Sequence, residues 1–203
     1  MESHFETIAD GLAERGFAIV NNFLTPAEVS AILHLDSFTN PAASFKKAGI
    51  GKSQERQINE SIRGDYIQWI DKKTAPPELL VYLHRLEALT QFLNRSLFLS
   101  LKDAEIHMTV YPVGTFYKRH LDQFRKDDHR ILSVICYLNE NWTVGDGGQL
   151  RLYFDNDTLD VPPTAGTLVC FRSDQLEHEV LPASRERLSL TGWMLDRYVD
   201  ITG

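Results

Sequence analysis

The sequence has little of what marks membrane-spanning, secreted or nucleic-acid-binding proteins. Its two cysteines, in the apolar stretches "SVICYLN" and "TLVCF", are too few for a Cys-rich zinc module and predict buried, reduced side chains. No apolar run approaches the roughly 20 residues that span a bilayer, and residues 1–16 lack the basic and apolar regions of a signal peptide. A net charge of −7 disfavours nucleic-acid binding, which needs a basic surface. We therefore expect a cytoplasmic protein without a membrane or nucleic-acid partner.

Helical signals dominate the first hundred residues. Residues 5–14 form a short amphipathic pattern, and residues 17–20 ("FAIV") predict a strand. A capping box made by Thr25 and Glu28 opens the segment "TPAEVSAILHLDSF" and predicts one helix through all of it. Leucines recur at helical spacing over residues 77–98, which predicts a long helix whose apolar stripe belongs to the core.

The second half of the chain changes to a strand pattern. After residue 104, short alternating or apolar runs are separated by Gly, Pro, Asn and Asp: "EIHMTVYP", "TFYKRHLD", "ILSVICYLN", "GQLRLYF", "GTLVCFR", "LEHEVLP" and "ERLSLTGWML". This spacing predicts an antiparallel barrel or jelly roll. We expect one α+β domain over residues 1–203, with helical support mainly in residues 1–100 and a jelly-roll core over about 104–196.

The tripeptide His-Leu-Asp occurs twice, and its two copies have different predicted geometry. On a helix, His34 and Asp36 would point in opposite directions, because positions i and i+2 lie about 200° apart. On a strand, positions i and i+2 share a face, so His120 and Asp122 would both reach one metal ion. Residues 116, 118, 120 and 122 would line one side of that strand. The second copy is therefore the candidate metal site.

A late histidine and an arginine complete the candidate site. A histidine in a strand is more often structural than a ligand, and His107 is a possible core histidine. His178, however, is followed nine residues later by Arg187, at the start of an apolar strand. Two histidines and one carboxylate form the facial triad of non-haem iron(II) oxygenases, which leaves metal positions open for a 2-oxo acid and dioxygen. A nearby arginine would pair with the far carboxylate of that acid.

These motifs resemble the 2-oxoglutarate- and iron(II)-dependent dioxygenases, and within them the prolyl hydroxylase domain group. The segments "YPVGTFYKRHLD", "ICYLNENW", "GGQLRLYF", "FRSDQLEHEVLPA" and "RLSLTGWML" follow that group's pattern in order. Upstream, "IRGDYIQWID" is similar to its characteristic "RGD…W" segment. The resemblance covers about residues 60–196 and implies a double-stranded β-helix, or jelly-roll, core buttressed by N-terminal helices, in a bacterial-type member.

The resemblance also assigns roles to individual residues. It implies iron ligation by His120, Asp122 and His178, and it gives the 5-carboxylate of 2-oxoglutarate to Arg187 with Tyr137. Tyr111 would contact the metal-binding end of the co-substrate, and the rest of its pocket would be formed by Leu150, Val180, Thr191 and Trp193. Positions near the substrate or the site mouth would be Arg63, Asp65, Trp69 and Arg130. Asp65 could instead be a turn former, Trp69 plain core and Arg130 a surface charge.

The implied reaction is hydroxylation of a prolyl residue in a protein or peptide. It would consume 2-oxoglutarate and dioxygen and release succinate and carbon dioxide, with ascorbate as a reductant. Elongation factor Tu is a candidate substrate by family association. Residues 44–61 ("SFKKAGIGKSQERQINES") would form the loop over the peptide, and this segment departs from the oxygen-sensing members of the group.

Other functions remain open from the sequence. The same scaffold could hydroxylate a free amino acid or another small molecule, although the "RGD…W" segment favours a peptide groove. A nucleic-acid demethylase fits poorly with the acidic charge. A non-catalytic 2-oxoglutarate or metal sensor would be expected to have lost a ligand. A zinc hydrolase could use two histidines and an aspartate, but would not explain Arg187 or Tyr137.

Overall fold

The computed structural model describes residues 2–49, 59, 61–123 and 129–198. Its helices are α1 (Glu2–Arg15), α2 (Pro26–Leu33), α3 (Asp36–Thr39), α4 (Pro41–Ser44) and α5 (Pro77–Leu97), with a 3₁₀ turn, η2, at Val144–Asp146. Its strands are β1 (Phe17–Val20), β2 (Lys46–Lys47), β3 (Tyr66–Trp69), β4 (Asp103–Tyr111), β5 (Tyr117–His120), β6 (Arg130–Tyr137), β7 (Leu150–Tyr153), β8 (Thr158–Val161), β9 (Leu168–Arg172), β10 (His178–Val180) and β11 (Arg187–Leu195).

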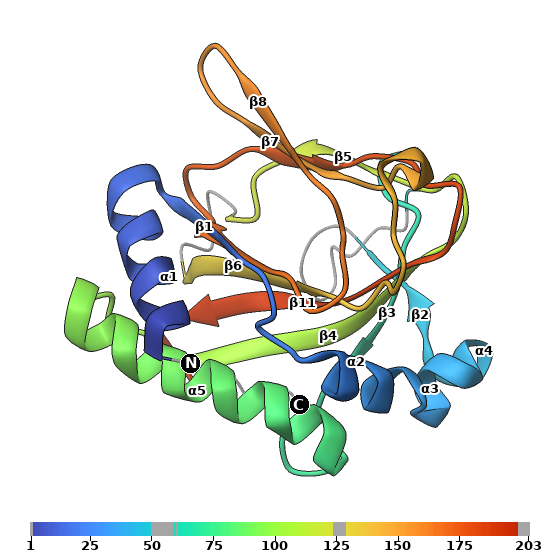
Figure 1. Ribbon diagram of the computed structural model, residues 1–203, viewed down its shortest axis with the longest axis horizontal. Coiled ribbons are helices and arrows are strands. Elements are labelled where there is room, and N and C mark those ends of the chain that lie inside the picture. Colours follow the sequence, from blue (N-terminus) through green and yellow to red (C-terminus); the bar gives the residue numbers. More distant parts are fainter. Residues whose placement is uncertain (1, 50–58, 60, 124–128, 199–203) are drawn as a thin grey trace.

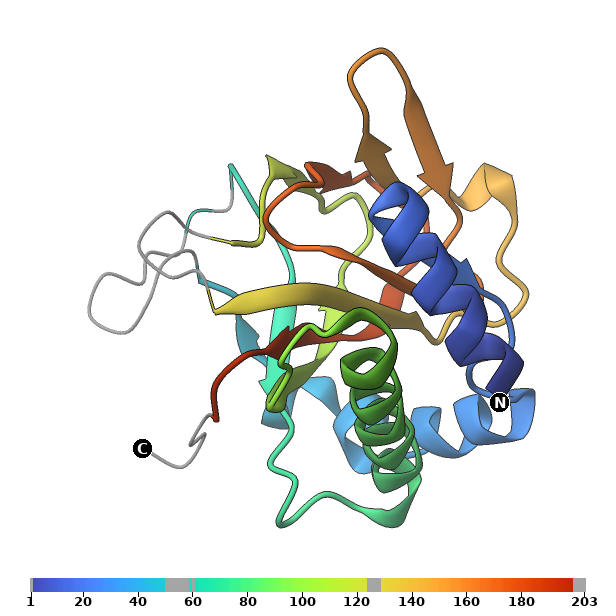
Figure 2. The ribbon, with the colours of Figure 1, turned by 90° about the vertical axis from the view of Figure 1, so that its left-hand side faces the viewer.

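Two antiparallel sheets face each other and form the predicted jelly-roll core. Within the part of the chain described, the major sheet has seven strands in the order β1-β9-β6-β11-β4-β3-β2, and the minor sheet has four in the order β5-β10-β7-β8. Most neighbouring strands are not consecutive in the chain, and from β4 to β11 the chain crosses repeatedly between the sheets. Helices α1 and α5 cover the far face of the major sheet (Figures 1 and 2). The predicted α+β class is confirmed, and β1, β2 and β3 extend the sheet into the first hundred residues.

Successive side chains of the interior strands point to opposite faces of the major sheet, and each face has its own apolar core. On β6, Val134 and Cys136 point to the helices and join a large apolar cluster with residues of α1, α2 and α5. The intervening Ile135 and Tyr137 point the other way and join a smaller cluster between the sheets. Because successive strand side chains face opposite sides, one strand serves both cores. Cys136 and Cys170 are buried and free, as predicted.

The helix predicted over "TPAEVSAILHLDSF" is wrong in its second half. Its start is confirmed, because the Thr25 side chain accepts from the Glu28 backbone N–H and the Glu28 side chain accepts from that of Thr25. The helix nevertheless ends at Leu33. Leu35 has extended backbone angles (φ −61°, ψ 143°) and acts as the N-cap of the short helix α3. His34 and Asp36 therefore lie on either side of a helix junction.

The long helix predicted over residues 77–98 is confirmed as α5. Most of its leucine stripe is buried, with Leu89 and Leu93 fully covered, whereas Leu80 is partly buried. The helix ends where Phe98 adopts a left-handed conformation with φ +54°, a position that most side chains avoid. Among the residues described, no helix combines the length and apolar character that crossing a membrane requires.

Candidate functional site

Three side chains that could hold a metal ion meet between the two sheets. His120 ends β5, His178 begins β10, and the two residues are directly paired across these strands. Asp122 lies two residues beyond β5, with Oδ1 3.5 Å from His120 Nε2 and Oδ2 3.6 Å from His178 Nε2. The candidate ligand atoms all lie within 4.8 Å of one another. Two imidazole nitrogens and one carboxylate oxygen are a donor set that suits non-haem Fe(II).

Backbone carbonyls orient both histidines. The Nδ1 of His120 lies 2.7 Å from the Lys118 carbonyl, and the Nδ1 of His178 lies 3.1 Å from the Leu176 carbonyl. A carbonyl only accepts, so in each ring Nδ1 carries the proton and donates it. This hydrogen bond fixes the tautomer, leaving an unprotonated Nε2 lone pair on each ring for a metal.

The electrostatics of the cluster favour metal binding at neutral pH. Burial opposes ionisation of Asp122, but the attraction of His178, which is protonated at the low pH where the carboxyl titrates, and the hydrogen bond from Ser133 outweigh it and hold the carboxyl pKa well below its usual range. Burial lowers the pKa of His178 to about 4 against the opposing effect of Asp122. Near pH 7 the cluster therefore presents an ionised carboxylate and a neutral imidazole at position 178, the forms that bind a cation.

The strand predicted over "TFYKRHLD" is shorter and less regular than expected. It ends at His120, so Asp122 lies in a bend rather than on the strand. The pairing register shifts between β10 and β5. His178 pairs with His120, but Val180, two residues later on β10, pairs with Tyr117, three residues earlier on β5. Such a bulge re-aims side chains. Tyr117 consequently stacks on His120, with ring centroids 3.6 Å apart, although strict alternation would place the two on opposite faces.

A pocket next to the cluster contains a buried, incompletely paired cation. Arg187 begins β11 and is only 2% exposed. Its Nε donates to the Gly148 carbonyl over 2.9 Å, and its Nη2 has no hydrogen-bond partner among the residues described. The hydroxyl of Tyr137 is also buried without a partner there. A buried guanidinium is costly unless an anion pairs with it, so this end of the pocket suits a carboxylate.

Most of the predicted pocket residues line this pocket together with the metal cluster. Besides Arg187, these are Tyr111, Leu150, Val180, Thr191 and Trp193. Tyr137 is not part of the lining, but its ring centroid lies 5.0 Å from the Arg187 guanidinium carbon. Burial raises the pKa of Tyr137 to about 12, partly offset by the charge of Arg187. Tyr137 therefore remains a protonated donor at neutral pH.

Arg63 and Asp65 also line the pocket and bind each other. The Arg63 guanidinium donates to both Asp65 oxygens, at 2.7 and 2.5 Å, and Asp65 is only 2% exposed. The guanidinium also lies over the ring of Tyr117, 4.4 Å from its centroid. Arg63, Tyr117 and His120 therefore form one stack that connects the "RGD" segment with the metal cluster. Asp65 is a buried ion-pair partner rather than a surface turn residue.

Trp69 and Arg130 lie outside the pocket lining, at its aromatic edge. Trp69 is 38% exposed and packs edge-on against His107, with centroids 4.9 Å apart. The Arg130 guanidinium lies over the ring of Trp193, 3.4 Å from its centroid, and pairs with Glu105. Trp69 is thus partly exposed rather than plain core, and Arg130 is half-buried rather than a free surface charge.

Sequence reasoning missed several residues of the site. His107, Thr109, Tyr117 and Ile135 all line the pocket. The signal for His107 and Thr109 was available, because they alternate with Tyr111 along "EIHMTVYP" and must share its face. Burial lowers the pKa of His107 to about 4, so it is neutral at pH 7.

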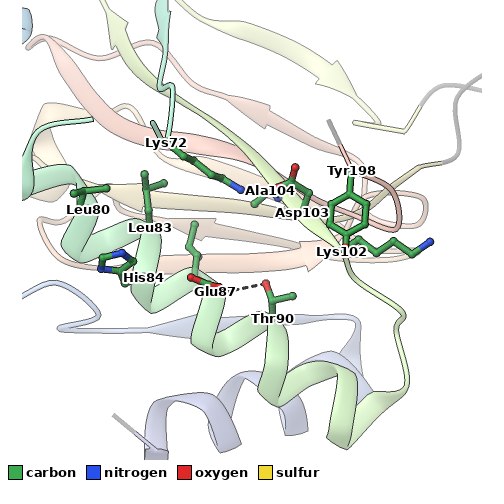
Figure 3. Close-up of a pocket in the computed structure, with 11 residues that line it drawn as sticks. Lys72, Leu80, Leu83, His84, Glu87, Thr90, Lys102, Asp103, Ala104 and Tyr198 are labelled. Carbon is green, nitrogen blue, oxygen red and sulfur yellow. Dashed lines mark hydrogen bonds and ion pairs between the residues drawn. The ribbon is translucent and has the colours of Figure 1, made fainter. Parts of the chain in front are cut away.

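A second cavity lies on the other side of the major sheet. It measures about 330 Å³ and is lined by α5, the start of β4 and Tyr198 (Figure 3). Its wall combines the apolar Leu80 and Leu83 with an ion pair between Lys72 and Asp103. Among the residues described, the only group of three that could hold a metal is the one between the sheets. We therefore assign the chemistry to the pocket between the sheets.

Comparisons with known proteins agree with this geometry. Residues 106–195 match the model of the 2OG-Fe(II) oxygenase superfamily. The crystal structure of a Pseudomonas putida prolyl-4-hydroxylase is 42% identical and has a TM-score of 0.86, covering 96% of this chain and 100% of that one. A Trichoplax adhaerens prolyl hydroxylase in complex with a hypoxia inducible factor peptide fragment is 30% identical, with a TM-score of 0.85, covering 96% of this chain and 90% of that one.

A relative that is much longer than this chain matches it over part of the relative's own length. The hypoxia-inducible factor prolyl hydroxylase of Caenorhabditis elegans is 31% identical over 95% of this chain, which spans 28% of that protein. Site, fold and relatives point to one family. The chain belongs to the 2-oxoglutarate- and Fe(II)-dependent oxygenase superfamily, within its prolyl hydroxylase group.

Proposed function

We propose that this protein hydroxylates C4 of a prolyl residue in a protein substrate, with Fe(II), 2-oxoglutarate and dioxygen. The observation that carries the proposal is the unpartnered Nη2 of the buried Arg187 beside the His120–Asp122–His178 cluster. A metal site alone would fit many enzymes. A metal site whose pocket also contains a buried cation fits a carboxylate-bearing co-substrate that binds the metal at its other end.

The residues divide this chemistry between them. His120, Asp122 and His178 would hold Fe(II), each with one ligand atom. When bound, Fe(II) with 2-oxoglutarate supplies the oxidation, in which one oxygen atom of O₂ enters proline and the other enters succinate, released with carbon dioxide. Leu150, Val180 and their apolar neighbours exclude water from the reacting atoms.

Arg187 and Tyr137 bind the far carboxylate of 2-oxoglutarate. The carboxylate accepts from the Arg187 Nη2 and from the Tyr137 hydroxyl, which satisfies two buried donors at once. Tyr111, whose pKa burial raises well above 10, keeps its proton and donates toward the metal-binding end. Thr191 and Trp193 complete the wall. This arrangement would orient the co-substrate in the pocket.

The substrate enters at the edge formed by Arg63, Asp65, Trp69 and Arg130. Trp69 and Trp193 offer apolar ring faces against which a proline ring would pack, with centroids 6.4 Å apart. A peptide substrate agrees with the Trichoplax relative, which was solved with a peptide fragment. Elongation factor Tu is our candidate target. Residues 44–61 would contact the peptide, but residues 50–58 and 60 lie outside the described part of the chain.

Peptide mass spectrometry tests the reaction. Purified protein with Fe(II) and 2-oxoglutarate is incubated with cell lysate and, separately, with elongation factor Tu. We expect a gain of one oxygen on proline, matched by succinate formation and absent without 2-oxoglutarate. Oxygen incorporation into a free amino acid, with no protein target modified, would support the small-molecule alternative. Binding of 2-oxoglutarate without succinate formation under any condition would support a non-catalytic sensor.

Three further properties belong to this proposal. Residues 1–203 act as one dioxygenase domain, with helical support mainly in residues 1–100 and a catalytic core over about 104–196. The reduced cysteines agree with a cytoplasmic location. Ascorbate acts as a reductant that keeps iron in the Fe(II) state, so its omission should shorten the linear phase of succinate production.

A further inference from the structure

Asp122 differs from the two histidines of the cluster in how it is positioned. His120 and His178 lie on paired strands, and each ring is oriented by a backbone carbonyl. Asp122 lies in a bend beyond β5, where no strand pairing fixes its backbone. The side-chain bonds of Asp122 can rotate, so a contact outside its own backbone must determine where the carboxylate oxygens point.

Two buried serines form a hydroxyl chain that ends on Asp122. The Ser133 Oγ lies 2.6 Å from Asp122 Oδ2, and the Ser173 Oγ lies 2.8 Å from the Ser133 Oγ. Ser133 is 1% exposed and Ser173 is fully buried. An ionised carboxylate only accepts, so Ser133 donates to Asp122 and must accept from Ser173. The negative charge on Asp122 therefore sets the direction of donation in both hydrogen bonds, from Ser173 to Ser133 and from Ser133 to Asp122.

The sheet holds this chain in place. Ser133 lies on the interior strand β6, paired with Trp193 of β11 on one side and Phe171 of β9 on the other. It shares the inner face of β6 with Ile135 and Tyr137, where a small hydroxyl leaves room for the Asp122 side chain. The backbone N–H of Gln123 donates to the Ser173 carbonyl over 3.1 Å. The bend after β5 is thereby tied to the end of β9.

We propose that Ser133, supported by Ser173, is a positioning residue that holds the Asp122 carboxylate in its metal-binding orientation. This deepens the proposed function and rests on it for the identity of the metal. The hydrogen bond occupies one lone pair of Oδ2 and directs the rest of the carboxylate toward His120 and His178. Loss of such a supporting partner typically weakens metal binding about 10- to 100-fold.

Cobalt(II) binding to the metal-free protein tests this role without turnover. Affinity is measured by calorimetric titration, and the visible absorption of bound Co(II) reports its coordination geometry. We expect Ser133→Ala to bind Co(II) roughly 10- to 100-fold more weakly, with an altered spectrum. Ser133→Thr keeps the hydroxyl and should retain wild-type binding and spectrum. Ser173→Ala should give a smaller loss, because it removes only the support behind Ser133.

The matched control is Thr167→Val. Thr167 is also a buried hydroxyl that donates to a side-chain oxygen, that of Asn21, over 3.1 Å, and it lies outside the pocket lining. Wild-type Co(II) binding and spectrum in Ser133→Ala, or an equal loss in Thr167→Val, would overturn the proposal. If Ser133→Ala does not fold, Ser173→Ala decides instead, because it removes the donor behind Ser133 and leaves the Ser133 hydroxyl in place. Wild-type Co(II) binding and spectrum in Ser173→Ala would then overturn the proposal.

Failure of this proposal is separable from failure of the proposed function. A wild-type protein that binds Co(II) through these residues but hydroxylates no protein would leave the role of Ser133 intact. A protein that hydroxylates proline normally, with Ser133→Ala unaffected in Co(II) binding, would leave the reaction intact and remove the positioning role.

Discussion

The two His-Leu-Asp copies of this chain have the same sequence but lie in different surroundings. His34 caps the C-terminus of α2, is exposed, and has its Nδ1 2.7 Å from the Ser30 carbonyl one turn back. Asp36 is exposed at the start of α3. His120 and Asp122, in contrast, face a third ligand 58 residues further along, His178.

The difference shows that the tripeptide supplies ligand types, whereas the fold supplies the site. The antiparallel pairing of β5 with β10 brings His178 opposite His120. The first copy has no such partner, since among the described residues it joins no cluster of potential metal ligands. Substitutions in the two copies should therefore have different consequences. Those at His120 or Asp122 should abolish activity, whereas those at His34 or Asp36 should change stability at most.

The largest effect is expected from removing a ligand. His178→Ala should reduce 2-oxoglutarate turnover by more than about 100-fold, beyond the usual cost of losing an outer partner of a metal ligand. His34→Ala should leave turnover unchanged and stability within about 0.5 kcal/mol, as is usual for exposed positions. Succinate assays and thermal unfolding of both variants provide the measurement. Similar activity losses in both would contradict the assignment of the second copy.

A smaller effect is expected at the carboxylate end of the pocket. Arg187→Gln removes a charged donor, worth about 1.5–3 kcal/mol, so 2-oxoglutarate should bind roughly 10- to 150-fold more weakly. The matched control is Arg185→Gln, two residues earlier, whose side chain is 46% exposed and pairs with Asp146. Titration of 2-oxoglutarate into each metal-loaded variant gives the affinities. An unchanged affinity in Arg187→Gln would place the carboxylate elsewhere.

Tyr137→Phe should have a milder effect on the same ligand. It removes one neutral donor while keeping the buried ring, so the affinity for 2-oxoglutarate should fall by about 1 kcal/mol, or roughly fivefold. Stability without ligand should stay the same or rise, because the hydroxyl has no partner among the residues described. Comparing unfolding with and without 2-oxoglutarate separates the two effects. A large loss of stability in the ligand-free protein would show that the hydroxyl serves the fold.

The smallest effect on activity is expected at the N-cap of α2, the helix that precedes the first His-Leu-Asp copy. Thr25→Ala breaks the capping box of α2 and should cost about 1 kcal/mol of unfolding free energy, a Tm decrease of about 2–4 °C for a chain of this size. Turnover below the new Tm should equal that of the wild type, because Thr25 is not among the residues that line the pocket. Reduced turnover in a fully folded sample would show that the helical region contributes to the site.

Local signals in the sequence predicted the elements but not all of their ends. The capping box at Thr25, the leucine spacing of α5 and the alternation of β4, β6 and β11 all act within a few residues of chain. The end of α2 at Leu33 is not marked by a Pro or Gly in the residues that follow directly. It depends on Leu35 adopting an extended conformation and packing with its neighbours against the core, which is a tertiary effect.

The site was predictable where it follows residue type and strand period. Residue type and strand period pointed to His120, Asp122 and His178, which the structure brings together, although Asp122 lies in a bend beyond the strand. Arg187 lines the same pocket, and its role remains a prediction. The stack of Tyr117 on His120 was not predictable, because the bulge opposite β10 breaks the period on which the prediction relied. The roles of Trp69 and Arg130 remain predictions, although both lie at the edge of the pocket.

The sequence by itself determined which atoms are available, namely two imidazoles, a carboxylate, a guanidinium and the strands that carry them. Only the tertiary structure decided which of two identical tripeptides meets its partners, and how Asp122 is held. Ser133 and Ser173 are 40 residues apart and unremarkable in the sequence, yet adjacent strands place their hydroxyls 2.8 Å apart. The physical reason is that hydrogen bonds and metal coordination depend on ångström-scale distances, which sheet pairing sets and sequence spacing does not.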